Sequence, residues 1–201
     1  EIDRKANYGY KSNKTGFELG TKFEFLTDLN LGLSTRAFYE TIDTDSTAST
    51  RQQKQKGDYF DTFVNTSFDY DKRNQKFRTT DGYRSFYSLD LPILSKTNTL
   101  TNTYNYKLYG ELYENNLSSL SLLLKSSNSL TGDDIKLSER LSIPGSRLRG
   151  FESGKVGPKD GGDFIGGNYL AALNFQSTLP KIFEDNQNID ILFFVDAANL
   201  W

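Results

Sequence analysis

Apolar and polar residues alternate along most of this chain with a period of two. From Phe17 to Phe25 the odd positions are apolar apart from Thr21, while the even positions carry charged residues or glycine. Successive side chains of a β-strand point to opposite faces, so this alternation predicts a strand with one apolar and one polar face. The alternation resumes after residues 27–28, which predicts a hairpin of two long strands.

Six further segments show the same alternation. The chain therefore predicts eight strands, near residues 17–25, 29–39, 60–70, 83–91, 99–113, 120–124, 169–179 and 189–195. The two longest connections, 43–57 and 127–167, fall on the same end of an up-and-down meander. The other end takes the connections at 27–28, 71–82, 114–116 and 180–188. Long strands with long loops at one end are typical of an outer-membrane β-barrel. Periodicity leaves a soluble all-β sandwich with half-buried strands as the alternative.

The composition excludes several classes of protein. There is no cysteine and no histidine, so these residues cannot build a disulfide framework, a structural zinc site or a histidine-based catalytic triad. The net charge of −2 offers no field for nucleic acid, and the longest apolar runs are far too short for a membrane helix. We therefore expect no enzyme activity, no cofactor, no metal and no nucleic-acid partner.

The connection at 127–167 holds nine of the 16 glycines and two of the four prolines, so we expect no regular structure there. It also contains spaced apolar residues, among them Leu141, Ile143 and Leu148, which predict a compact and packed loop. The polar stretch 41–57, by contrast, is typical of an exposed flexible loop.

The sequence Ile143-Pro-Gly-Ser-Arg-Leu-Arg149-Gly150-Phe151, followed by segments 156–160 and 166–168, resembles the sixth extracellular loop of BamA-type outer-membrane assembly factors. In that family an Arg-Gly-Phe or Arg-Gly-Tyr tip folds back into the barrel. Two further segments, 68–83 and 192–201, resemble a strand-turn-strand unit of the family and the late strand whose aspartate meets the loop arginine. The resemblance spans essentially the whole chain.

The resemblance implies a set of site residues without a catalytic group. They are the loop motif Arg149, Gly150 and Phe151, the lumen partner Asp196, and the loop-supporting residues Gly157, Pro158, Gly166 and Gly167. By parity Asp196 lies opposite Phe193 and Val195, so it faces the lumen if those two meet lipid. An arginine on a glycine-flanked loop can bind a carboxylate through two hydrogen bonds. Gly150 lets the backbone approach closely, and Phe151 can pack against the inner wall. The alternative is that Arg149 is one of several solvated loop cations.

The resemblance also implies the architecture. The fold class is an all-β, transmembrane, antiparallel up-and-down barrel, and the eight strands would be the sixth to thirteenth of a 16-stranded one. The chain begins at Glu1 and holds no methionine, which favours a mature product or an excised piece. Residues 1–201 are thus expected to be a fragment of the barrel domain, with loop 127–167 folded into the lumen and with the periplasmic domains and remaining strands absent.

The function implied by the resemblance is the folding and insertion of other outer-membrane β-barrel proteins, by strand addition at a barrel seam outside this piece. The expected partners are unfolded β-barrel clients, assembly-complex lipoproteins and outer-membrane lipid, in the outer membrane of a Gram-negative bacterium. The alternatives are a related translocation barrel such as a two-partner secretion transporter, a diffusion porin, and a soluble surface-binding β protein.

Overall fold

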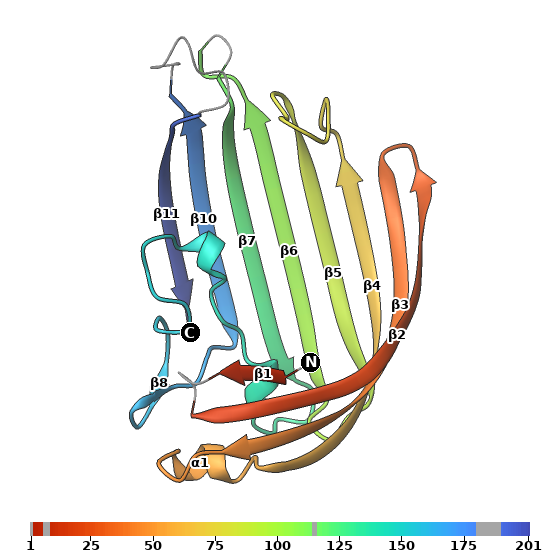
Figure 1. Cartoon of the computed structure of the whole chain (residues 1–201). Helices are drawn as coiled ribbons and strands as arrows, with labels where there is room; N and C mark the ends of the chain where they lie inside the picture. Colours follow the sequence, from red (N-terminus) through yellow and green to blue (C-terminus); the bar gives the residue numbers. More distant parts are fainter. Residues whose placement is uncertain (1, 6–8, 114–115, 180–189) are drawn as a thin grey trace.

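A curved antiparallel sheet of nine strands makes up most of the computed structural model, which describes residues 2–5, 9–113, 116–179 and 190–201 (Figure 1). Its long strands are β2 (Tyr10–Leu26), β3 (Leu29–Thr44), β4 (Gly57–Asp71), β5 (Gly82–Leu94), β6 (Thr99–Gly110), β7 (Ser118–Ser129), β10 (Tyr169–Thr178) and β11 (Leu192–Leu200). The short strand β1 (Ile2–Lys5) pairs with β2. The connections contain α1 (Thr50–Gln53), the 3-10 turns η2 (Leu137–Glu139) and η3 (Gly145–Arg147), and a hairpin of β8 (Lys159–Asp160) and β9 (Asp163–Phe164).

The strand order is β1-β2-β3-β4-β5-β6-β7-β10-β11, so each long strand pairs with its neighbours along the chain. This confirms the eight predicted strands and their up-and-down order. Among the described strands β1 and β11 do not pair with each other, so the sheet is open. The predicted connections at 114–116 and 180–188 lie largely outside the described residues.

The observed strands differ from the predicted ones mainly at their ends. β2 begins at Tyr10 instead of Phe17, because its polar first residues continue the hydrogen-bonded ladder with the end of β3. β6 ends at Gly110, and β11 continues to Leu200. Backbone pairing extends a strand wherever a partner strand is present, whatever the hydropathy of the side chains.

One face of the sheet is apolar and exposed. Phe17 and Leu19 on β2 are 71% and 76% exposed, and Phe193 and Val195 on β11 are more than half exposed. The opposite face carries polar and charged side chains, of which Glu40 on β3 is completely buried. A sandwich would bury the apolar face against a second large sheet, whereas the other sheet in the described residues is only the β8–β9 hairpin. No helix in the described ranges is long and apolar enough to cross a membrane.

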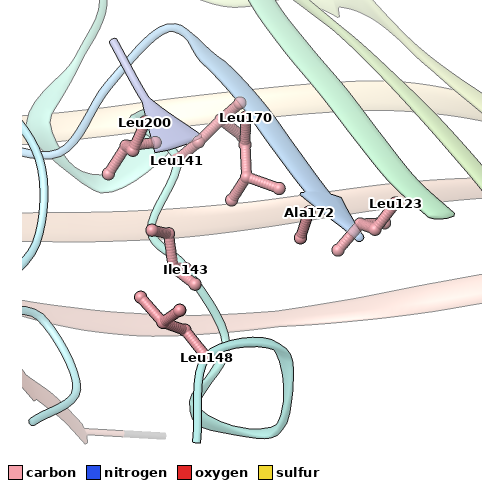
Figure 2. Packing of buried hydrophobic residues seen from close by; sticks show 7 residues of the cluster. All are labelled: Leu123, Leu141, Ile143, Leu148, Leu170, Ala172 and Leu200. Carbon is pink, nitrogen blue, oxygen red and sulfur yellow. The ribbon is translucent and has the colours of Figure 1, made fainter. Parts of the chain in front are cut away.

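The connection between β7 and β10, residues 130–168 and here called the long loop, lies against the inner face of the sheet (Figure 1). Its residues Leu141, Ile143 and Leu148 pack against side chains of β7, β10 and β11 (Figure 2). The strand residues in this cluster are Leu123, Leu170, Ala172 and Leu200. Leu137 belongs to a second buried cluster, with Tyr10, Ile42 and Tyr59. The prediction of a compact, packed loop is confirmed, whereas the expectation of no regular structure is wrong, because the loop contains η2, η3 and the β8–β9 hairpin.

The prediction of an exposed flexible loop at 41–57 is confirmed for exposure, since most of its residues are exposed, but the segment is ordered by the end of β3 and by α1. Ser49 caps α1 through a capping box with Gln52, and the Gln52 side chain is completely buried. Arg51 donates two hydrogen bonds to Asp134 of the long loop, with N–O distances of 2.5 Å. The segment is polar in composition, but its polar groups find partners 79 to 111 residues away in the long loop. Local sequence does not reveal such pairs.

The two faces of the sheet should respond differently to an added charge. Leu124 on β7 is 40% exposed on the apolar face, and Leu124→Lys should weaken folding in lipid by up to about 2 to 4 kcal/mol, the cost of a lysine near the bilayer midplane. Thr101 on β6 pairs with Ser127, three residues beyond Leu124 on β7, and lines an inner hollow of about 650 Å³ that is also lined by Glu18 and Asp90. Thr101→Lys should therefore cost little. The measurement is urea unfolding of the complete protein in lipid vesicles, and similar losses for both variants would contradict the assignment of faces.

Candidate functional site

Arg149 and Asp196 form a two-pronged ion pair between the long loop and β11. Arg149 Nε donates to Asp196 Oδ2 at 2.7 Å, and Nη2 donates to Oδ1 at 2.6 Å. The backbone N–H of Arg149 also donates to Oδ2, at 3.0 Å. The Asp196 side chain is only 3% exposed, on the face opposite Phe193 and Val195. The structure therefore brings the two residues together in the inward-facing arrangement that parity requires.

Asn174 on β10 completes the environment of the Asp196 carboxylate. The two residues lie opposite each other in the β10–β11 ladder, and Asn174 Nδ2 donates to Asp196 Oδ1 at 2.8 Å. The same amide group donates to the backbone carbonyl of Arg147 at 2.9 Å. Asn174 thus connects the aspartate to the backbone of the loop. The sequence analysis missed this role, because alternation assigns a face to Asn174 but does not give its cross-strand neighbour.

Arg147 is a second loop arginine that the sequence analysis did not select. Its guanidinium donates to Ser121 Oγ at 2.5 Å, and to Asn174 Oδ1 and Asn105 Oδ1 at 3.1 Å each. Arg147 therefore contacts β6, β7 and β10, whereas Arg149 contacts mainly β11, with one long hydrogen bond of 3.5 Å to Gln176 on β10. No periodic pattern could have identified Arg147, because it ends the 3-10 turn η3 and does not lie in a strand.

The electrostatics of the two arginines differ. Hydrogen bonding to Asp196 raises the pKa of Arg149 above its ordinary value, although partial burial opposes the change. Burial lowers the pKa of Arg147, whose hydrogen-bond partners are neutral oxygens. The Arg149 guanidinium also lies 3.8 Å from the centroid of the Phe194 ring, in cation–π contact. Arg149 is thus fixed by charge, by hydrogen bonds and by an aromatic ring, and it is not a freely solvated loop cation.

Gly150 and Phe151 occupy positions other than those expected. Gly150 has a φ of +85°, and a Cβ added to it would meet nothing within 4 Å. Its glycine is therefore required by the turn and not by a close approach of the backbone. Phe151 is 63% exposed and does not pack against the inner wall formed by the described strands. Gly150 thus forms a turn directly after Arg149, and Phe151 follows this turn on the exposed side of the loop.

The four residues expected to support the loop are Gly157, Pro158, Gly166 and Gly167. They lie where the loop packs against Leu200 at the end of β11 and against Leu141 in its own first half. A Cβ added to Gly157 or Gly167 would come within 2.8 Å of a Leu200 side-chain atom, so both glycines permit close packing. Gly166, at φ +74°, lies against the backbone carbonyl of Leu141. Its neighbour Gly167 forms an isolated β-bridge with Leu141. The carbonyl of Pro158 accepts a hydrogen bond from the backbone of Ile165 at 3.1 Å. No group of acidic side chains in the described ranges is arranged to hold a metal ion.

Gly166 should tolerate a side chain less well than Gly161. Both have positive φ, +74° and +63°, so alanine at either costs about 1 to 2 kcal/mol in backbone strain. Only at Gly166 would the new Cβ also approach a backbone oxygen, that of Leu141, to 2.6 Å, whereas Gly161 faces open space. Gly166→Ala should therefore make the long loop clearly more sensitive to protease in the folded protein than Gly161→Ala does. Equal sensitivity of the two variants would mean that the contact with Leu141 does not hold the loop.

Comparison with known proteins places this chain in a family. The family model described as the Omp85 superfamily domain matches residues 1–201. The chain is 34% identical to a SAM50-like protein of Schizosaccharomyces pombe over 85 residues, which are 41% of this chain and 18% of that protein. The chain is also similar to the crystal structure of BamA from Haemophilus ducreyi lacking POTRA domains 1–3, with a TM-score of 0.83 and 21% identity. The match covers 96% of this chain and 42% of the BamA chain. The chain thus spans less than half of either relative. Because the family model matches the chain from end to end, this protein belongs to the Omp85 superfamily and has the fold of a BamA-type barrel region.

Proposed function

We propose that this chain is the barrel part of an outer-membrane assembly factor, which folds other β-barrel proteins and inserts them into the membrane. The observation that carries the proposal is the long loop, held on the inner face of an Omp85-superfamily sheet by the ion pair of Arg149 and Asp196. The similarity to a BamA and to a SAM50-like protein supports assembly as the activity.

The proposed mechanism needs no covalent chemistry. An exposed strand edge offers backbone N–H and C=O groups to an incoming strand, and main-chain pairing binds that strand without strict demands on its sequence. In this proposal the eight long strands are the sixth to thirteenth of a 16-stranded barrel, and the seam between its first and last strands lies outside residues 1–201. The loop supports the wall remote from the seam, so that the seam is the part that opens.

The proposal extends to partners and location. The partners are unfolded outer-membrane β-barrel proteins, assembly-complex lipoproteins and the lipid that meets the apolar face. We assign the protein to the outer membrane of a Gram-negative bacterium, with periplasmic domains and the remaining strands elsewhere in the complete protein. One of the relatives comes from a yeast, so the comparisons support an outer membrane without specifying the bacterial one.

Two alternatives remain for the test to separate. A translocation barrel of the two-partner secretion type would share the Arg-Gly-Phe loop, and the similarity to a BamA and to a SAM50-like protein is what favours assembly over export of a soluble partner. A diffusion porin needs a wide water-filled lumen, whereas here Leu141, Ile143 and Leu148 pack the loop against the inner wall.

The ion pair should show thermodynamic coupling in a double-mutant cycle. Removing one partner of a buried pair costs about 3 to 5 kcal/mol and breaking an exposed pair about 0 to 1 kcal/mol. Asp196 is buried and Arg149 is 27% exposed, so we expect Arg149→Ala and Asp196→Ala each to cause a loss between these limits. The double variant should lose less than the sum, since the second change removes a group already unpaired. The measurement is the temperature at which the complete protein no longer migrates as the compact folded form on a gel.

A matched control for this cycle is Lys155→Ala, because Lys155 pairs with Glu152 on the same loop at 2.9 Å but both side chains are largely exposed. It should change the heat resistance little and add to Asp196→Ala without coupling. Strictly additive losses from Arg149→Ala and Asp196→Ala would show that the loop is held by other contacts.

The activity itself can be tested with the purified complete protein in lipid vesicles. An assembly factor should accelerate the folding of an added, urea-unfolded β-barrel client relative to empty vesicles. The acceleration should fall in Arg149→Ala and persist in Lys155→Ala, because only the first change releases the loop. Steady single-channel conductance without acceleration would favour a porin, and passage of a soluble protein without acceleration would favour a secretion transporter.

A further inference from the structure

A second ionic cluster lies buried at the base of the long loop, away from Arg149 and Asp196. Lys136, directly before η2, has a side chain with no exposed surface. Its Nζ lies 2.9 Å from Glu40 Oε2 on β3 and 3.2 Å from Glu139 Oε1 on η2, and it donates a short hydrogen bond to Asp61 on β4. The side chains of Glu40 and Asp61 are also fully buried. One ammonium group thus joins the loop to two adjacent strands.

The remaining oxygens of these carboxylates also have partners. Ser12 on β2 and Ser138 on the loop donate to Glu40 at 2.5 and 2.9 Å. Ser95 donates to Asp61 at 2.7 Å, and Thr97 donates to Glu139 at 3.2 Å. A buried charge is tolerated when its hydrogen-bonding capacity is filled in this way.

Further charged and aromatic groups surround Lys136 from the neighbouring strands. Lys14 on β2 lies 3.6 Å from Glu40, so the cluster contains two cations and three carboxylates. The rings of Tyr59 on β4 and Phe38 on β3 lie 5.0 and 5.7 Å from Lys136 Nζ. The Tyr10 hydroxyl on β2 donates to the backbone carbonyl of Leu137 at 2.9 Å. Burial alone would lower the pKa of Lys136, but the surrounding carboxylates reverse this and raise it above its ordinary value.

The segment between Lys136 and Arg149 is packed along its length. Leu137 joins the buried cluster on β2, β3 and β4. Leu141 exchanges backbone hydrogen bonds of 2.8 and 3.0 Å with Gly167, and Ile143 and Leu148 enter the cluster on β7, β10 and β11 (Figure 2). Because the segment is packed along its length, a displacement of its base should also displace Arg149 at its tip.

We propose that Lys136 is a positioning residue of the long loop: its ionic cluster fixes the base of the loop to β3 and β4, and this places Arg149 at the tip where it meets Asp196 on β11. The loop is then held at both ends, at its base by β3 and β4 and at its tip by β11. This inference goes beyond the proposed function, because it requires only that the loop is clamped inside the sheet and holds for assembly, export or diffusion alike.

The test follows the tip of the loop while the base is changed. A spin label is attached to Ser146→Cys in the complete protein, which is convenient because residues 1–201 contain no cysteine. Lys136→Met replaces the ammonium group by an uncharged side chain of similar length and should release the tip, seen as a mobile component in the electron paramagnetic resonance spectrum of the folded protein. Lys155→Met is the matched control, since it removes an exposed lysine of the same loop at a similar separation along the chain from the label, and it should leave the spectrum unchanged.

A compensating change separates positioning from a general loss of stability. Without Lys136, the crowded carboxylates of Glu40, Asp61 and Glu139 face each other with only Lys14 nearby, and their like charges repel. The label of Lys136→Met should therefore be mobile, while the label of the unchanged protein stays immobile.

Adding Glu40→Gln and Asp61→Asn to Lys136→Met should make the label immobile again, because the repelling charges are gone. An immobile label in Lys136→Met, or a label that stays mobile after these two carboxylates are neutralised, would overturn the proposal, and so would a mobile label in Lys155→Met. The readout does not involve client folding. Failure here and failure of the proposed assembly activity are therefore distinguishable.

Discussion

The alternation of side chains along each strand is the constraint on which the rest of this structure depends. A strand that presents apolar residues to one side must present its intervening residues to the other, and here those residues include Glu40, Asp61 and Asp196. Carboxylates on a crowded inner face require cations and hydrogen-bond donors. The long loop supplies both, so its path is determined by where the strands place their acids.

Two kinds of cation meet these acids, and the chemistry of each suits its place. At the tip a planar guanidinium spans both oxygens of a single carboxylate and stacks on Phe194. At the base a compact ammonium group is shared among carboxylates from two strands and from the loop itself. The first arrangement selects one orientation of one partner, whereas the second gathers several chain segments around a point charge.

Sequence reasoning succeeded where the determining pattern is local. The eight strands follow from a two-residue period, and the resemblance identified Arg149 and Asp196 before their contact was visible. It missed Asn174 and Lys136, because their partners depend on strand register and on the return path of a loop, which no local pattern contains. It misjudged 41–57 and Phe151 for a related reason. Polarity does not distinguish a solvated loop from one whose polar groups pair with distant residues, and motif similarity does not determine the direction of the chain after a turn.

The cluster of Figure 2 has a consequence for the order of events during folding. Leu200 lies at the end of β11, and Asp196 follows Arg149 by 47 residues, so the tip of the loop rests on a strand that follows it in the chain, whereas its base rests on β3 and β4. Contacts of this sequence separation form only after the intervening chain has closed on itself, which makes them slow to nucleate. The hairpin of β10 and β11 must therefore exist before the tip of the loop can settle. Docking of the loop tip is then a late step of folding, which only chains with β10 and β11 already in register can complete.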